Sequence, residues 1–214
     1  MRLGPGCIPF PFSRLYVMAV ARQSLFRGLY LEVAREVSAE LPQGRVLDAG
    51  CGPGDLAMRL AGLAPSLQVW GVDISKDMIR LARKRAAATA AADRLHFERA
   101  DVACLPFAAA SFDACVSTIA LHHWRRPWLA LSALYQVLRP GGFALIRDID
   151  RNASGAAIRA AARRHGAAVR LIHLARLIES FPSQESLRRL LAESPFPTFS
   201  VERCGVFLRA RLEK

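Results

Sequence analysis

The sequence predicts an α/β fold, in which a mostly parallel β-sheet carries helices on both faces. Short apolar or β-branched runs alternate with stretches of helical periodicity, and this alternation is typical of parallel β-α-β units. A glycine-rich turn separates the first of these strands from the first of these helices. Strands are expected near residues 45–49, 68–73, 95–99, 112–117 and 143–149, and helices near 54–63, 76–91, 127–138 and 156–178.

The two ends of the chain show other patterns. Residues 1–12 are rich in Gly and Pro and predict an extended arm, whereas residues 13–41 have helical periodicity. Ser183 is a hydroxyl cap for a helix that reaches about residue 192. Two alternating runs, 199–203 and 206–211, are separated by a turn and predict a β-hairpin.

Neither a repeat nor a change of composition marks a domain boundary, so 214 residues predict a single domain. Residues 1–41 form its arm and helical cap, and residues 43–148 its core. Residues 150–178 form a variable, Arg-rich helical segment, and residues 183–214 form the final helix and β-hairpin.

Composition narrows the class of protein. Five cysteines without a C-x-x-C pair indicate neither a disulfide framework nor a zinc site, so we expect no metal and a cytoplasmic location with reduced thiols. No apolar run approaches the ~18 residues of a membrane span, and no signal peptide is expected. The net charge of +12 would allow the protein to bind nucleic acid or an anionic surface. Because no block of five basic residues occurs, we favour arginines spread over solvated faces.

The stretch DAGCGPG at residues 48–54 carries the strongest functional signal. A strand, a glycine turn and a helix place free backbone N–H groups at the carboxyl edge of a parallel sheet, where ligands of open α/β folds bind. A dinucleotide fingerprint would need glycine at position 55, which is Asp, and a Walker phosphate loop is also missing. Asp48 would repel phosphates but suits a ligand with an ammonium group.

Five motifs in order resemble those of class I S-adenosylmethionine-dependent methyltransferases, and most closely the small-molecule subgroup that includes the ubiquinone and menaquinone biosynthesis methyltransferases. The first is the glycine stretch, and the match covers about residues 43–148. The other motifs are VWGVDIS at 69–75, ADV at 100–102, FDACVS at 112–117 with LHHW at 121–124, and VLRPGG at 137–142. The resemblance implies a Rossmann-like, seven-stranded, mostly parallel sheet whose last strand is antiparallel.

The resemblance also implies S-adenosyl-L-methionine as cofactor and a set of residues that bind it. Asp48 would favour the cationic amino end, Asp73 would accept both ribose hydroxyls, and Asp101 would accept the adenine amine. Caps of helices or turns are the alternative roles of these acids. The full expected set is Asp48, Ala49, Gly50, Cys51, Gly52, Asp73, Ile74, Met78, Asp101, Val102 and Ser117.

Two histidines are the candidate catalytic residues. A neutral imidazole of His122 or His123 could remove a proton from a hydroxyl or an acidic carbon at pH 7. Ordering of the loop by one ring and packing of the other on Trp124 is the alternative. Tyr16 and Tyr30, on the N-terminal helical region, could line the acceptor pocket. That region is expected either to form a lid or to pack on the sheet.

The function expected from the resemblance is methyl transfer to a small organic acceptor. An RNA methyltransferase, acting on tRNA for example, is the first alternative, because the net charge permits it. It is not favoured, since no RNA-binding module or aromatic-basic stacking pattern is visible. A non-catalytic subunit with a methyltransferase fold is the second alternative.

Overall fold

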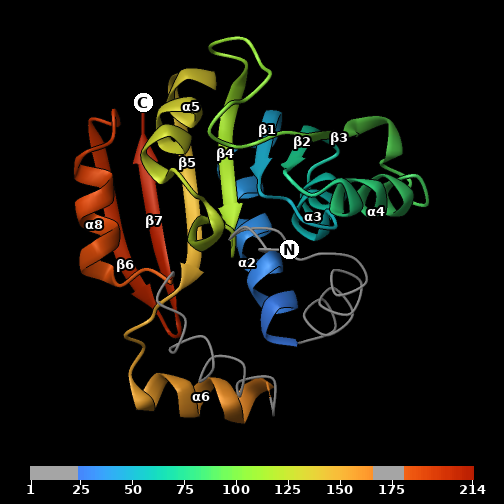
Figure 1. The fold of residues 1–214 in the computed structure, drawn as a ribbon. Helices are drawn as coiled ribbons and strands as arrows, with labels where there is room; N and C mark the ends of the chain where they lie inside the picture. The colour runs from blue at the N-terminus through green and yellow to red at the C-terminus, as the bar shows by residue number, and fades with distance from the viewer. Residues whose placement is uncertain (1–23, 166–180) are drawn as a thin grey trace, which may run out of the picture.

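The computed structural model describes residues 24–165 and 181–214 (Figure 1). Within these residues the strands form a seven-stranded sheet in the order β3-β2-β1-β4-β5-β7-β6. The strands are β1 (Gln43–Ala49), β2 (Ser66–Asp73), β3 (Leu95–Arg99), β4 (Phe112–Thr118), β5 (Leu138–Ile149), β6 (Thr198–Cys204) and β7 (Phe207–Glu213). The strands β1 to β5 are parallel, whereas β7 is antiparallel to both of its neighbours. The predicted fold class is therefore confirmed.

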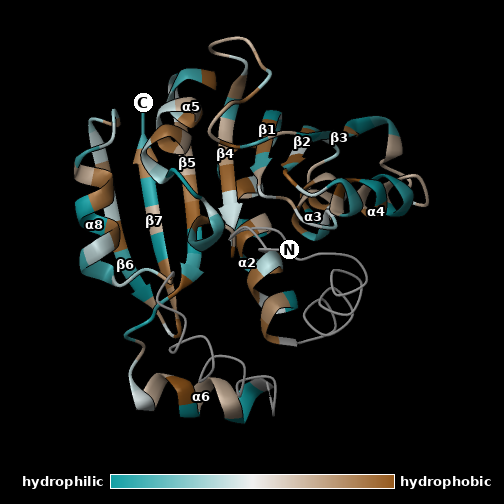
Figure 2. Cartoon of the chain, viewed as in Figure 1, coloured by the Kyte–Doolittle hydropathy of each residue, from teal (hydrophilic) through white to brown (hydrophobic). Residues whose placement is uncertain are grey.

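Helices cover both faces of the sheet. The described helices are α2 (Ser24–Glu40), α3 (Asp55–Leu63), α4 (Lys76–Ala86), α5 (Pro127–Val137), α6 (Gly155–His165) and α8 (Gln184–Ala192), with short 3-10 helices η1 (Ala92–Arg94) and η2 (Leu121–His123). One core joins α2, α3 and α4 to the sheet, and a second core joins α5 and α8 to its other face. Teal and brown bands alternate along α6 and α8, as expected for amphipathic helices (Figure 2).

Local sequence explains where several elements begin. The Ser75 hydroxyl accepts a hydrogen bond from the Met78 N–H and caps α4. Ser183 and Ser186 form a reciprocal capping box at the start of α8, so the predicted cap is observed. Leu60 of α3 and Leu131 of α5 are fully buried, and burial of such a side chain contributes roughly 1.5–3 kcal/mol to stability.

Two predicted boundaries were wrong. The helix expected over 76–91 ends at Ala86, because the Thr89 hydroxyl and N–H both donate to the Ala86 carbonyl and fold the chain into a turn. The strand expected over 143–149 already begins at Leu138. Gly141 and Gly142 remain in the sheet because their backbones exchange hydrogen bonds with Lys214, beside a register shift against β4.

The helix α2 packs on the sheet, which is one of the two arrangements expected for the N-terminal helical region. Leu29, Val33 and Val37 of α2 are buried in the first core. On another side of the helix, carboxylates recur every four residues and face arginines of β5 and β7. The ion pairs are Glu32–Arg147, Glu36–Arg147, Glu36–Arg209 and Glu40–Arg211. Residues 1–23, including Tyr16, and residues 166–180, where the helix expected over 156–178 would continue, lie outside the described residues.

Candidate functional site

The glycine turn leaves open space at one position only. Gly50, Gly52 and Gly54 all have positive φ, at 81°, 52° and 82°, which L side chains rarely adopt. A Cβ on Gly50 would lie 2.5 Å from the Cβ of Ala120, and one on Gly54 would lie 2.9 Å from the ring of Phe97. A Cβ on Gly52 would meet nothing within 4 Å. The backbone at Gly52 therefore faces a space that a ligand could fill.

Asp73 borders this turn at the end of β2. One carboxylate oxygen accepts the N–H of Gly52 at 3.0 Å, and the other accepts the N–H of Ser75 at 2.8 Å. Burial nevertheless raises the pKa of Asp73, and these two N–H groups offset only part of that rise. The carboxylate is thus fixed in position and incompletely compensated, so additional hydroxyl donors or a cation would stabilise it.

Asp48 is buried at the end of β1, and one of its oxygens, Oδ2, has no hydrogen-bond partner. Burial, followed by the negative charges of Asp73 and Asp55, raises the pKa of Asp48 to about 8, while the N–H of Ala57 in α3 acts in the opposite direction. A pKa of about 8 leaves the Asp48 carboxyl largely protonated at pH 7 when no ligand is bound. A positively charged ligand would favour its ionised form.

The residues expected around adenine follow the ends of β2 and β3, which pair with each other in the sheet. Ile74 directly follows Asp73 and is 40% exposed, while Met78 and Val102 are buried. Asp101 accepts the N–H of Ala103 at 2.9 Å. The structure thus gives Asp101 the turn-capping role that was the alternative in the sequence, while its second oxygen, 3.7 Å from Arg126, remains near solvent.

Buried polar atoms without partners gather where β1, β4 and β5 end. In the described part of the chain they include Asp48 Oδ2, Ser117 Oγ, Thr118 Oγ1, Trp124 Nε1 and two nitrogens of Arg147. Native proteins pair nearly all of their buried polar groups with protein, water or ligand. Those beside the open glycine turn are consistent with a binding site, and the cofactor contact expected of Ser117 stays a prediction.

Ala49 and Cys51, also in the expected set, present no exposed side chain at the turn, and their contacts with the cofactor stay predictions. Both side chains are buried, and the N–H groups of Gly50 and Cys51 both donate to the carbonyl of Val72. Burial, with the charges of Asp48 and Asp73, raises the pKa of the Cys51 thiol well above its usual value. Cys51 is therefore not a nucleophile at neutral pH.

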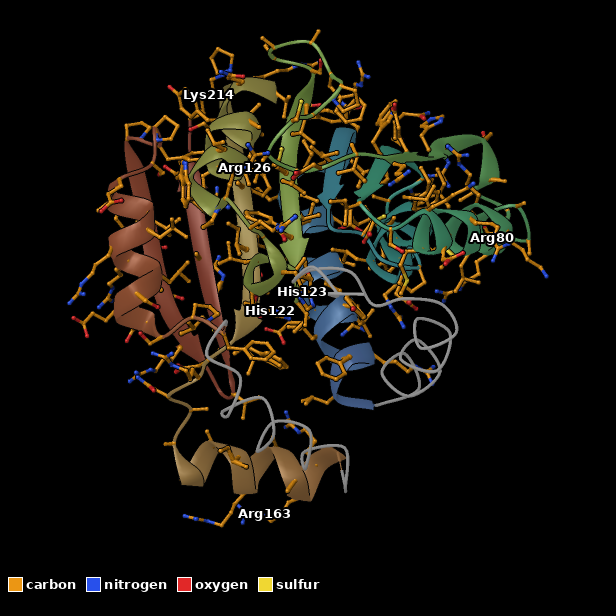
Figure 3. The ribbon with its side chains drawn as sticks, viewed as in Figure 1. Arg80, His122, His123, Arg126, Arg163 and Lys214 are labelled. Atoms are coloured by element: carbon orange, nitrogen blue, oxygen red, sulfur yellow. The ribbon has the colours of Figure 1, made fainter. Side chains whose placement is uncertain are left out.

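His122 and His123 follow β4 in η2 and lie together below the end of that strand (Figure 3). The Nδ1 atom of His122 is 3.0 Å from both carboxylate oxygens of Asp148, and its backbone N–H donates to the same carboxylate at 3.1 Å. Asp148 is fully buried and accepts Nδ1–H, so Nε2 of His122 is the nitrogen with a free lone pair. This arrangement fits a general base held by a carboxylate.

The two rings that flank His122 fix its plane. Its centroid is 3.9 Å from that of His123 and 4.0 Å from that of Phe181. His123 keeps part of its surface exposed, but burial of its packed side, followed by the charge of His122, lowers its pKa to about 4. His123 is therefore neutral at pH 7 and serves as a packing partner for His122, which makes His122 the better candidate base.

Sequence reasoning missed Asp148 and Phe181 as neighbours of His122. Asp148 lies 26 residues after His122 and was noted only as the end of the matching stretch. Two charged residues inside an apolar strand, Arg147 and Asp148 between Ile146 and Ile149, were the available signal, because buried charged groups need partners. Phe181 gave no such signal.

Comparison with known proteins places the chain in a family. A family model described as a methyltransferase domain matches residues 46–142. A demethylmenaquinone methyltransferase of Thermus thermophilus is 30% identical over 76% of this chain and 79% of its own length. The chain belongs to the class I S-adenosylmethionine-dependent methyltransferases. Among the described residues, no helix is long and apolar enough to cross a membrane, and no group of acidic, His and Cys side chains is arranged to hold a metal.

Other relatives match the chain over different shares of their own length. The O-methyltransferase cnsE of Penicillium expansum is 39% identical over 55% of this chain and 43% of its own length. A solved structure of a proposed S-adenosyl-L-methionine-dependent methyltransferase from Methanococcus maripaludis has a TM-score of 0.77 and 21% identity, covering 100% of this chain and 97% of that one. The chain spans less than half the length of several curated relatives that it matches.

The observed residues fit S-adenosylmethionine, the cofactor of this family. Its ammonium group is cationic and matches Asp48, whose ionised form a positive charge would favour, and its ribose hydroxyls match the incompletely compensated carboxylate of Asp73. The open face of Gly52 admits the ligand to the backbone, and exposed Ile74 offers an apolar surface to the adenine. The individual contacts of the expected residues remain predictions.

Proposed function

We propose that this methyltransferase transfers a methyl group to a small acceptor that carries an acidic hydroxyl, with His122 as general base. The pair formed by His122 and Asp148 carries the proposal, because Asp148 fixes the ring and leaves Nε2 to accept a proton. Relatives of this chain include an O-methyltransferase and a demethylmenaquinone methyltransferase. A hydroxyl whose proton is removed can react at its oxygen or, in an aromatic ring, at the adjacent carbon, so one base serves both outcomes.

The proton and charge balance of the step is simple. S-adenosylmethionine, when bound, supplies a methyl group on a sulfonium. The acceptor hydroxyl gives its proton to Nε2 of His122, and the resulting anion displaces the neutral thioether from the methyl carbon. Asp148 stabilises the imidazolium that forms, as an acid partner does in other histidine bases. The remaining rate enhancement comes from orientation of the two reactants in the site.

The buried environment of the pair supports this assignment. The side chain of His122 is 4% exposed, and Phe181 covers one face of its ring. A base in such a position is shielded from bulk water, so its proton exchanges mainly with a bound acceptor. We also infer a cytoplasmic location, since Cys51, Cys104, Cys115 and Cys204 are all free thiols.

The test is transfer of a labelled methyl group to a panel of hydroxylated small molecules, with total RNA in parallel. His122→Gln and Asp148→Asn should lower kcat by roughly 100- to 10,000-fold, the usual contribution of a general base. The dissociation constant for S-adenosylmethionine should change less than about threefold, because neither side chain touches the glycine turn. Labelled RNA without labelled small molecules would refute the proposal.

A second measurement separates a base from a merely structural histidine. Acceptors whose hydroxyl is already ionised at the assay pH do not need a base. His122→Gln should therefore slow these acceptors much less than acceptors with an un-ionised hydroxyl. An equal loss for both kinds of acceptor would mean that His122 only shapes the site.

A further inference from the structure

An exposed patch at the start of α5 has no role in the site described above. We define the α5 patch as Arg125, Arg126, Trp128 and Leu129. Trp128 is 54% exposed and Leu129 is 38% exposed. In the described residues only two other large hydrophobic side chains are exposed to this degree, Leu63 and Ile74, and neither is adjacent in sequence to another. Both arginines of the patch are also exposed.

The fold does not explain these residues. The first turn of α5 contains no acid, and Arg126 occupies its N-cap without a side-chain cap. Arginines at the positive end of a helix are mildly destabilising, since that end favours negative charge. The one ion pair in the patch, Arg126 with Asp101 at 3.7 Å, is largely exposed and contributes little to stability. Trp128 could be replaced by a polar residue without loss of core packing.

The position of the patch relates it to the candidate site. The patch begins two residues after His123. Trp124 lies between them, and its indole nitrogen Nε1 is buried. Arg126 reaches Asp101, which precedes the predicted adenine contact Val102. The α5 patch therefore follows the histidines in the chain and contacts Asp101 through Arg126, which Figure 3 shows near the start of α5.

We propose that the α5 patch docks this methyltransferase on an anionic lipid surface. Trp and Leu side chains partition into the membrane interface, and each basic residue near an anionic surface adds about 1 kcal/mol of attraction. The net charge of +12 favours approach to such a surface over association with a second copy of the chain. Two apolar and two basic residues give reversible binding, not a permanent anchor.

The proposal concerns where the chain binds in the cell and goes beyond the proposed function. Docking itself does not depend on catalysis. Vesicle binding and methyl transfer can therefore fail independently of one another.

The experiment is co-sedimentation of the whole chain with vesicles of phosphatidylglycerol and phosphatidylcholine in equal parts, and with vesicles of phosphatidylcholine alone. The protein should bind the anionic vesicles, and raised salt should weaken this binding. The variants Trp128→Ser/Leu129→Ser and Arg125→Ser/Arg126→Ser should each lower the partition coefficient at least fivefold. Calorimetric binding of S-adenosylmethionine should stay unchanged in the Trp128→Ser/Leu129→Ser variant, and the circular dichroism spectrum should stay unchanged in both, which shows that the variants are folded.

Matched controls remove the same chemistry elsewhere. Leu63→Ser removes an exposed apolar side chain, and Arg80→Ser/Lys84→Ser removes two exposed cations from α4. Both should bind the vesicles within about twofold of the unmodified chain. Absence of binding to anionic vesicles, or equal losses in the controls and the patch variants, would overturn the proposal. Retention of a single-stranded RNA by the unmodified chain, with loss in the patch variants and no vesicle binding, would assign the patch to nucleic acid instead.

Discussion

Replacement of Asp48 by Asn should make the ligand-free protein more stable at alkaline pH while weakening cofactor binding. The side chain keeps its shape, so the amide oxygen can still accept the N–H of Ala57. What the change removes is a carboxylate that is buried with one oxygen unpartnered and lies near the charges of Asp73 and Asp55. Function and stability therefore oppose each other at this position.

The direction follows from the raised pKa of Asp48. In the unfolded chain the carboxyl has an ordinary pKa near 3.8, and in the folded chain the pKa is about 8. Below the lower value both states hold the proton and no penalty exists. As pH rises from about 4 to about 8 the unfolded state loses its proton first, so the folded state loses relative stability, and above about 8 the full penalty is present.

One pKa unit corresponds to about 1.4 kcal/mol, so a shift of this size sets an upper limit of roughly 6 kcal/mol. Relaxation and water entry reduce such penalties, so we expect Asp48→Asn to gain about 2–5 kcal/mol over the unmodified chain between pH 5 and pH 9. The affinity for S-adenosylmethionine at pH 7 should fall about ten- to a hundredfold, because a hydrogen bond to a charged group contributes about 1.5–3 kcal/mol.

Urea unfolding from pH 5 to pH 9 without ligand measures the first effect, and calorimetry measures the second. Asp93→Asn is the control, because Asp93 is an exposed acid in η1. Parallel stability curves for the Asp48→Asn variant and the unmodified chain would show that the buried carboxyl titrates normally. Undiminished cofactor affinity would exclude Asp48 from the ammonium site even if the stability effect were found.

Three further changes test the remaining parts of the site. Asp73→Ala should weaken S-adenosylmethionine binding about ten- to a hundredfold in a folded variant, because the ribose hydroxyls lose a charged acceptor; calorimetry that finds no change would remove Asp73 from the site. Gly52→Val should abolish binding while the circular dichroism spectrum persists, because its side chain would enter the open space at a strained φ of 52°. Arg159→Glu/Arg163→Glu/Arg164→Glu on α6 should leave cofactor affinity within about twofold, since these side chains are exposed and Arg163 points away from the sheet (Figure 3). Salt-dependent RNA binding that this triple variant loses would favour the RNA alternative.

The residues expected to bind the cofactor could be predicted from the sequence because their conformation depends on local chemistry. A positive φ at Gly50, Gly52 and Gly54 is a property of each residue and its neighbours, so glycine spacing predicts the turn directly. The position of Asp73 after an apolar strand likewise predicts a carboxylate at the sheet edge. Parallel pairing of β1 with β2 then brings that carboxylate to the turn, as the bond from the Gly52 N–H shows.

Side-chain contacts between residues far apart in the sequence could not be predicted in this way. Glu32 and Arg147 are separated by 115 residues, and their contact exists only because α2 crosses the sheet over β5. The end of α4 was misplaced for the opposite reason. An alanine-rich run favours helix at every position, and a single hydroxyl, that of Thr89, decides where it stops.

The candidate base shows where the two kinds of information meet. The sequence predicted that His122 and His123 follow β4 but could not show which of them is the better candidate base. That choice depends on residues of β5, which lies beside β4 in the sheet. Side chains alternate along β5, so Arg147 points toward α2 while Asp148 points toward the opposite face and reaches His122. A shift of β5 by one residue would exchange these two side chains and place an arginine beside the histidine. The base at His122 therefore depends on the register of β5, which the pairing with β4 and β7 fixes over its whole carboxyl half.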